Sequence, residues 1–289
     1  MKKPIFYVLS LFVILLVASC GSKEAKFESI FNGTNFDGWE TYLGVPDPSV
    51  DVPGMERNEE GVYTQPIGLN KDPLKVFSIK NVDGEPALYV TGQVYGSFAT
   101  VKEYENYHLR LEVKWGNKKW APREDKPMNA GVLYHSIGEF GAGLGVWKMS
   151  HECQVMETMF GDSYRMSNTY CDVTASRTSE NERYTFDKKA SKVSFGHDLP
   201  AGPICSKNPM NEKDHGEWNV IEVLCYEGTS VHVINGKVNM INTDSHIKVD
   251  GKKVPLTKGA IQLQSEGAEI YYRKMEIRPI TGIPDQYLK

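Results

Sequence analysis

Apolar and polar side chains alternate strictly from Tyr107 to Trp115, and this period of two is the pattern that most constrains the fold. Every second residue of the segment is a large apolar one, and the residues between them are His, Arg, Glu and Lys. Such alternation is typical of a strand that buries one face and exposes the other, as strands of antiparallel sheets do. No long apolar stripe with helical spacing accompanies it.

Shorter segments of the same kind recur along the chain, and turn residues separate them. Asn235-Gly236 is the strongest hairpin signal among these turns. Besides 107–115, strands are expected at residues 30–45, 60–66, 86–91, 97–101, 218–226, 231–234, 259–265 and 269–280. Loops are expected at 46–58 and 117–128, and an irregular insertion at 174–216. The pattern predicts an all-β, two-sheet antiparallel jelly-roll sandwich, whose curled sheet offers a concave groove to a ligand.

The N-terminal residues have the character of an export signal. Lys2 and Lys3 precede an apolar run, Ile5–Val17, that is too short to span a bilayer. Small residues then lead to Cys20, which fits a bacterial lipobox; the alternative is an ordinary signal peptide with a chance cysteine. The expected organisation is a signal peptide at 1–19, a lipidated Cys20 with a tether at 20–28, and one β-sandwich domain at 29–289. We therefore expect a lipoprotein of the periplasm or outer membrane, attached to the membrane through its N-terminal lipid.

The charge of the chain argues against nucleic acid as a partner. There are 33 Lys and Arg against 37 Asp and Glu, a net charge of −4, and loss of Lys2 and Lys3 would make it more acidic. A slightly acidic protein has no electrostatic attraction to a polyanion, and it suits a neutral ligand such as a carbohydrate. The remaining cysteines lack zinc-site spacing, and both buried thiols and disulfides are compatible with them; they are Cys153, Cys171, Cys205 and Cys225.

The densest set of candidate catalytic groups lies between His151 and Glu157. Alternation places Glu152 and Gln154 on one face of a strand and would turn Glu157 towards the core, where an unpaired carboxylate is costly. A β-bulge near Val155-Met156 would re-aim Glu157 onto the face of the other two. We therefore expect two carboxylates and an amide in the groove; the alternative is a solvent-facing polar strand edge.

A second strand, 129–135, is expected beside the first. Its alternation places Asn129, Gly131 and His135 on the groove face. An imidazole that titrates near neutrality suits proton transfer, which makes His135 a candidate acid or base. The alternative is a hydrogen-bonded structural histidine. His151 has the wrong parity for the groove.

Four further side chains are candidates for substrate binding. Trp147 follows a glycine-rich stretch and either stacks on a sugar from an exposed rim or packs in the core. Asp162 follows a turn after the carboxylate strand and is placed within reach of the groove. Gln264 alternates with apolar residues and is expected on the groove floor. Arg273 shares the parity of apolar residues, so it needs either a carboxylate partner or a ligand.

Several stretches, taken in order, resemble the 3-keto-disaccharide hydrolase domain family. They are FESIFNGTNFDGW at 27–39, NAGVLYH at 129–135, ECQVME at 152–157 with GD at 161–162, GEWN at 216–219, ING at 234–236, and GAIQLQSEG at 259–267 with YR at 272–273. The resemblance implies a concanavalin A-like lectin/glucanase fold and action on 3-keto-glycosides. Some relatives carry Asp-His-Gly where this chain has Ser265-Glu266-Gly267. The strand at 152–157 also resembles the E-x-D-x-x-E strand of laminarinase-type β-glucanases, with Gln154 in place of the aspartate.

A ketone at C3 of a glycoside acidifies the proton on C2, which permits elimination of the C1 substituent and later addition of water. On this hypothesis Glu152 or His135 is the base and Glu157 assists the leaving group. The enolate oxygen would be held by His135, Gln154, Arg273 or a divalent metal, for which His135 and Glu152 are the candidate ligands. Two other functions remain open, a non-catalytic carbohydrate-binding lipoprotein and a retaining β-glycosidase of the laminarinase type.

Overall fold

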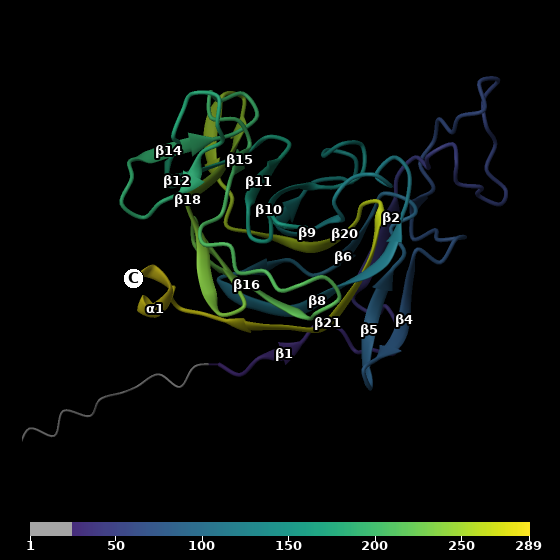
Figure 1. Ribbon diagram of the computed structural model, residues 1–289, viewed down its shortest axis with the longest axis horizontal. Helices are drawn as coiled ribbons and strands as arrows, with labels where there is room; N and C mark the ends of the chain where they lie inside the picture. Colours follow the sequence, from purple (N-terminus) through teal and green to yellow (C-terminus); the bar gives the residue numbers. More distant parts are fainter. Residues whose placement is uncertain (1–24) are drawn as a thin grey trace, which may run out of the picture.

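A computed structural model describes residues 25–289, and two stacked antiparallel sheets form nearly all of it (Figure 1). The signal peptide and Cys20 expected from the sequence lie outside the described residues, and their assignment stays a prediction. Across the described part no helix has the length and apolar character needed to cross a membrane. The prediction of an all-β, two-sheet antiparallel sandwich is confirmed.

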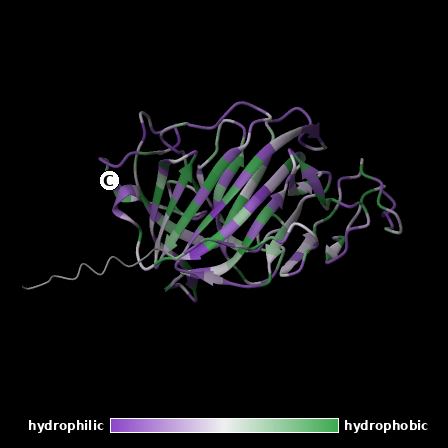
Figure 2. Ribbon diagram, turned by 90° about the horizontal axis from the view of Figure 1, so that it is seen from below, coloured by the Kyte–Doolittle hydropathy of each residue, from purple (hydrophilic) through white to green (hydrophobic). Residues whose placement is uncertain are grey.

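The larger sheet has twelve strands. In spatial order they are β13 (Thr185–Phe186), β12 (Thr169–Ser176), β18 (Lys237–Val249), β17 (Thr229–Ile234), β16 (Asn219–Tyr226), β8 (Tyr107–Lys119), β21 (Ala268–Pro279), β5 (Glu85–Val90) and β4 (Phe77–Val82), with β1 (Glu28–Ser29), β14 (Lys192–Phe195) and β19 (Lys252–Pro255) paired to β21, β12 and β18. Seen from below in Figure 2, hydrophilic and hydrophobic bands alternate along the long strands. This is the period of two expected for a sheet with one buried face.

The nine-stranded sheet lies above it in Figure 1 and carries the candidate site. Its order is β15 (Ile204–Cys205), β11 (Ser163–Met166), β10 (Met149–Met156), β9 (Asn129–Ile137), β20 (Lys258–Ser265), β6 (Gly96–Thr100), β2 (Trp39–Leu43) and β3 (Gly68–Leu69), with β7 (Tyr104–Glu105) paired to β20. One short helix, α1 (Asp285–Leu288), ends the chain. Consecutive strands in this list pair antiparallel, and β9 and β10 lie near the middle of the sheet.

Several sequence-based element assignments need correction. In the expected strand 30–45 only Trp39–Leu43 forms a strand, and the long strand β12 was not predicted. The segment 60–66 is not a strand, because the side-chain oxygen of Asn58 accepts hydrogen bonds from the amides of Glu60 and Val62 and turns the chain there. The expected loop at 117–128 begins later than predicted, since β8 continues to Lys119. Strands β4 and β18 were not predicted. The four described cysteines are all buried free thiols, so the disulfide alternative is wrong for these residues.

Between the sheets, the apolar core contains a polar network. The hydroxyl group of Tyr134 lies 2.7 Å from Ser230 Oγ and 3.0 Å from His232 Nε2, and Asn242 Nδ2 donates to the Ser230 hydroxyl at 3.1 Å. Burial lowers the pKa of His232 to about 4, so this imidazole is neutral in the folded protein near pH 7. Each of these groups is buried, and their mutual hydrogen bonds offset the cost of removing them from water.

Removing one member of this network should destabilise the fold. Tyr134→Phe leaves the buried Ser230 and His232 groups short of a partner, and we expect a loss of about 1–3 kcal/mol in the free energy of unfolding. Urea denaturation at pH 7.5 measures it. Tyr226→Phe is the matched control, because the half-buried Tyr226 hydroxyl has no hydrogen bond to any residue in 25–289. Equal stabilities for the two variants would contradict the network's role.

Candidate functional site

The candidate site lies on the outer face of the nine-stranded sheet, where β10 presents Glu152. Cys153 and Val155 belong to the inter-sheet core, so Glu152 and Gln154 point the other way, as alternation predicted. The Glu152 side chain is nevertheless 2 % exposed. The neighbouring residues must therefore account for the burial of this carboxyl group.

The absence of a side chain at Gly131 makes room for that carboxyl group. A Cβ atom at this position of β9 would lie 2.2 Å from Glu152 Oε1 and 2.4 Å from Gln264 Oε1. The Glu152 carboxyl and the Gln264 amide thus meet above the Gly131 backbone. Gln264 Oε1 is buried without a hydrogen-bond partner, and Glu152 makes no hydrogen bond to any described residue. Two acceptors in this position are satisfied when a proton, or a ligand hydroxyl, lies between them.

Glu266 provides the second carboxyl group of the site. It follows β20 directly, in phase with Gln262 and Gln264, and it is 8 % exposed. Burial raises the pKa of Glu266 to about 7, while the nearby Arg123 guanidinium and a hydrogen bond from Asn129 act in the opposite direction. Arg123 Nη1 lies 3.9 Å from Glu266 Oε1. Glu266 therefore titrates in the range where a general base is effective.

Glu266 influences the ionisation of Glu152. Burial, and then the negative charge of Glu266, raise the pKa of Glu152 well above its usual range. Glu152 accordingly retains its proton at neutral pH, whereas Glu266 is close to its midpoint. Two carboxyl groups held in different states can serve as an acid and a base in one site.

Arg123 and Tyr95 complete one side of the carboxyl pair. Arg123 Nη2 donates to Pro127 O at 3.2 Å and lies 3.6 Å from Met156 Sδ, which fixes the guanidinium beside Glu266. Burial and then the Glu266 charge raise the pKa of Tyr95, and a hydrogen bond with Arg123 opposes this. The cation is thus positioned where it can stabilise negative charge that develops near Glu266.

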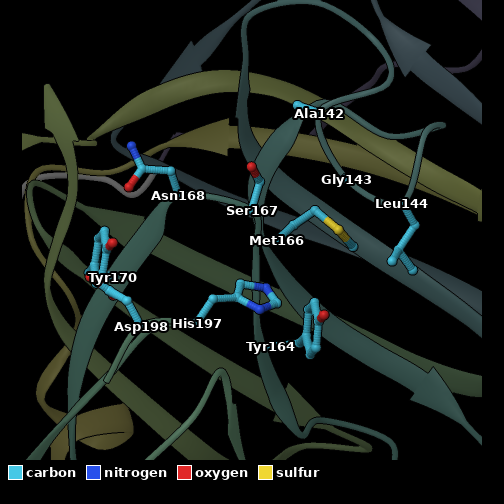
Figure 3. A pocket seen from close by; sticks show the side chains of 10 residues that line it. All are labelled: Ala142, Gly143, Leu144, Tyr164, Met166, Ser167, Asn168, Tyr170, His197 and Asp198. Atoms are coloured by element: carbon cyan, nitrogen blue, oxygen red, sulfur yellow. The ribbon is translucent and has the colours of Figure 1, made fainter. Parts of the chain in front are cut away.

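Tyr164 lies on the other side of the pair. It is directly opposite Glu152 in the β10–β11 register, and it also lines a pocket of about 430 Å³. Figure 3 shows Tyr164, Tyr170, His197 and Met166 around this pocket, with Leu144 at its rim. Tyr164 therefore connects the pair of carboxyl groups, Glu152 and Glu266, with the pocket.

His135 does not reach the site. The register of β9 with both of its neighbours shifts by one residue here, and His135 has a φ of +51°. This bulge turns the imidazole between the sheets, where its ring packs against Tyr107 and Tyr134. Burial lowers the pKa of His135 to about 4. Its predicted place in the groove is wrong, and Ser136 occupies that face instead, hydrogen-bonded to Gln262. His151 faces the core, as predicted.

Glu157 is also separated from Glu152. The predicted bulge near Val155-Met156 is absent, because the β9–β10 register is continuous from His151 to Met156. Glu157 follows the end of β10, accepts a hydrogen bond from the Met128 amide at 2.8 Å and lies 3.3 Å from His215 Nδ1. It belongs to a different hollow, beside Trp115.

The structure also places three other candidates, Trp147, Asp162 and Arg273. Trp147 is fully buried and donates its indole N–H to Gly96 O at 2.9 Å, so it packs in a small cluster and does not form an exposed rim. Asp162 accepts from the Lys207 amide at 2.9 Å, and that bond fixes its carboxyl group. Arg273 lies on the larger sheet in an ion pair with Glu112 at 2.6 Å, a structural role.

Gln154 and Asn129 lie close to where they were expected. Gln154 is half-buried beside Glu152 on β10, and its side-chain oxygen accepts from the Val155 amide at 3.1 Å. Asn129 is buried and donates to Glu266. No group of three His, Cys, Asp or Glu side chains in residues 25–289 is arranged to hold a metal ion. The proposed ligand pair of His135 and Glu152 is divided between the two faces of the sheet.

Glu266 was missed as a site residue because it was assigned to the turn between two strands. The signal was present, since Gln262, Gln264 and Glu266 occupy successive positions of one face. Arg123 had no comparable signal. It is located in an irregular segment whose path is set by contacts with Pro127 and Met156.

The chain belongs to the 3-keto-alpha-glucoside-1,2-lyase-like domain family, which matches residues 26–278. This family places it among carbohydrate-active proteins.

Comparison with solved structures gives only distant similarity. Two proteins of Parabacteroides distasonis ATCC 8503, both provisionally named glycosyl hydrolases, are 18 % and 16 % identical, with TM-scores of 0.42 and 0.45. The matches cover 73 % and 88 % of this chain and 93 % and 94 % of theirs. A Bacillus subtilis carbohydrate-binding module, CBM66, is 5 % identical with a TM-score of 0.40, over 70 % of this chain and 91 % of that one. None of the curated proteins matches.

The raised pKa of Glu266 predicts a stability effect with a definite pH dependence. Ionising this buried carboxyl group is harder in the folded chain than in the unfolded one, so stability falls as pH rises from about 4.5 through 7. Glu266→Gln removes that cost. We expect the variant to be more stable than the parent at pH 8 by about 3 kcal/mol, and equally stable at pH 4.5.

Urea denaturation at the two pH values measures this difference. Glu59→Gln is the control, because Glu59 is an exposed acid on a loop. A Glu266→Gln variant that gained no stability at pH 8 would show that the carboxyl group ionises without penalty.

Proposed function

We propose that this protein cleaves 3-keto-glycosides by elimination, with Glu152 and Glu266 as its acid and base. The family match supports this substrate class. The observation that carries the mechanism is the burial of two carboxyl groups in one site, with environments that hold them in different protonation states. Neither His135 nor Glu157 takes part.

The first step needs a base near neutrality. In a 3-keto-glycoside the C2 proton is acidic, because the electrons left behind are delocalised onto the ketone oxygen. Glu266 removes this proton in its ionised form, and an enolate forms. Arg123, fixed 3.9 Å from Glu266, stabilises the negative oxygen.

The second step needs an acid at the leaving oxygen. As the enolate collapses, a C1–C2 double bond forms, the bond from C1 to the aglycone oxygen breaks, and Glu152 donates its proton to that oxygen. The ketone is regenerated, and the products are an unsaturated keto-sugar and a free alcohol. Addition of water across the double bond gives the 3-keto-sugar, so the net reaction is hydrolysis.

Incubating the purified protein with a 3-keto-glucoside and with its unoxidised parent separates three functions. These are cleavage of 3-keto-glycosides, ordinary glycoside cleavage, and binding without turnover. We expect release of the alcohol from the keto compound alone, because the parent lacks an acidic C2 proton. In D₂O the hydrated product should carry deuterium at C2, as detected by mass spectrometry. Cleavage of the parent would indicate an ordinary glycosidase, and binding of both without turnover would indicate a lectin-like protein.

The roles of the acids are tested by a matched pair of substitutions. Glu152→Gln keeps the shape of the side chain and removes the transferable proton, so we expect kcat on the 3-keto-glucoside to fall at least 100-fold, the order of a general acid's contribution. Glu157→Gln, five positions along the chain, retains an acceptor for the Met128 amide and should leave kcat within about twofold. A large loss of kcat in Glu157→Gln, with none in Glu152→Gln, would assign the catalytic acid to Glu157 and exclude Glu152.

A further inference from the structure

The pocket beside Glu152 lies outside the carboxyl pair itself, because neither Glu152 nor Glu266 lines it. It has a volume of about 430 Å³ and lies over β11, next to the strand that carries Glu152. Tyr164 faces Glu152 and Met166 faces Ser150 across the β10–β11 pair. A group bonded to the oxygen that Glu152 protonates would therefore extend over Tyr164 towards Met166.

Apolar and aromatic side chains dominate this pocket. Tyr164 contacts the edge of His197, with ring centres 5.7 Å apart, and Tyr170 is stacked on His246 at 5.3 Å. Figure 3 shows the Tyr164, His197 and Tyr170 rings around one space, closed by Met166. The Lys248 ammonium also lies over the Tyr170 ring, 4.1 Å from its centre, so Tyr164 is the ring that offers a flat surface to a planar ligand.

Some polar groups of the pocket are engaged elsewhere, whereas the side chains of Tyr164, Ser167 and His197 make no hydrogen bond to any described residue. Asp198 pairs with Lys248 at 2.8 Å, and the side-chain amide of Asn168 donates to Lys248 O at 2.7 Å. A sugar presents hydroxyl groups on every side and needs several free partners. Apolar atoms nonetheless form most of the pocket surface, which favours an aromatic group over a second sugar.

Leu144 stands at the rim of the pocket with 72 % of its surface exposed, and its φ is +47°. The loop that carries it, 138–148, is fixed from both sides. Phe140 stacks on Tyr42 at 4.8 Å, and the Trp147 indole is buried against the sheet. The protein thus holds an apolar side chain at the pocket entrance, where it is available to cover an apolar ligand.

We propose that this pocket is the leaving-group site and that it takes an aromatic aglycone, such as the ring of an aryl or arylmethyl glycoside. This inference rests on the proposed function for its link to catalysis. The ring lies against Tyr164, Tyr170 and Met166, and Leu144 covers its outer edge. The aglycone oxygen then lies beside Glu152.

Benzyl and methyl 3-keto-glucosides test the proposal, because their leaving alcohols have similar basicity and only one carries a ring. We expect kcat/KM to be at least tenfold higher for the benzyl compound, from burial of the ring. Leu144→Ser should reduce this preference at least threefold. Leu69→Ser is the control, because Leu69 is 49 % exposed at the opposite edge of the sheet.

Two outcomes would overturn the proposal. One is an equal kcat/KM for the benzyl and methyl compounds, or a preference that Leu144→Ser and Leu69→Ser leave alike. The other is a higher kcat/KM for a 3-keto-disaccharide than for the benzyl compound, which would make the pocket a sugar subsite.

A separate binding measurement distinguishes failure of this proposal from failure of the proposed function. Unoxidised benzyl and methyl glucosides are titrated into the protein and followed by calorimetry. Should neither keto compound be cleaved, tenfold tighter binding of the benzyl glucoside that is lost in Leu144→Ser would still support an aromatic-group pocket. Equal binding of the two glucosides would show that the pocket does not select an aromatic group.

Discussion

Burial of the Glu152 carboxyl group is the constraint on which the rest of the site depends. An ionised carboxylate in this position would lack both water and a hydrogen-bond donor, so the group retains its proton. The space it occupies exists because β9 has no side chain at Gly131. The pairing of β9 with β10, the absence of a side chain at Gly131 and the raised pKa of Glu152 thus depend on one another at one point of the sheet.

The opposite face of the same strands meets a different requirement. There Tyr134 and His232 are buried among apolar residues and are stabilised by hydrogen bonds to one another. The bulge at His135 adds a further imidazole to this layer. The inter-sheet histidines are therefore part of the packing, and in the proposed function the acids on the outer face carry the proton transfers.

The alternation of apolar and polar residues was sufficient to predict the sandwich and to place Glu152 and Gln154 on the outer face. Side chains were misplaced where the backbone departs from two residues per repeat. His135 and Lys274 both adopt positive φ values within bulges, and each shifts the parity of its strand. The bulge expected before Glu157 is absent. Non-glycine residues give little sign of such a conformation, so the pattern alone could not locate these shifts.

The two carboxyl groups and the residues that line the pocket come from separate parts of the chain. Glu266 follows β20, whereas the pocket is built from β11 and from the loop before β10, and Glu152 lies between them. On the proposed function, substitutions in that loop change which molecules are accepted while Glu152 and Glu266 stay in place. The specificity of such a protein can then change through the surface segments that line the pocket, without change to the strands that position the two carboxyl groups.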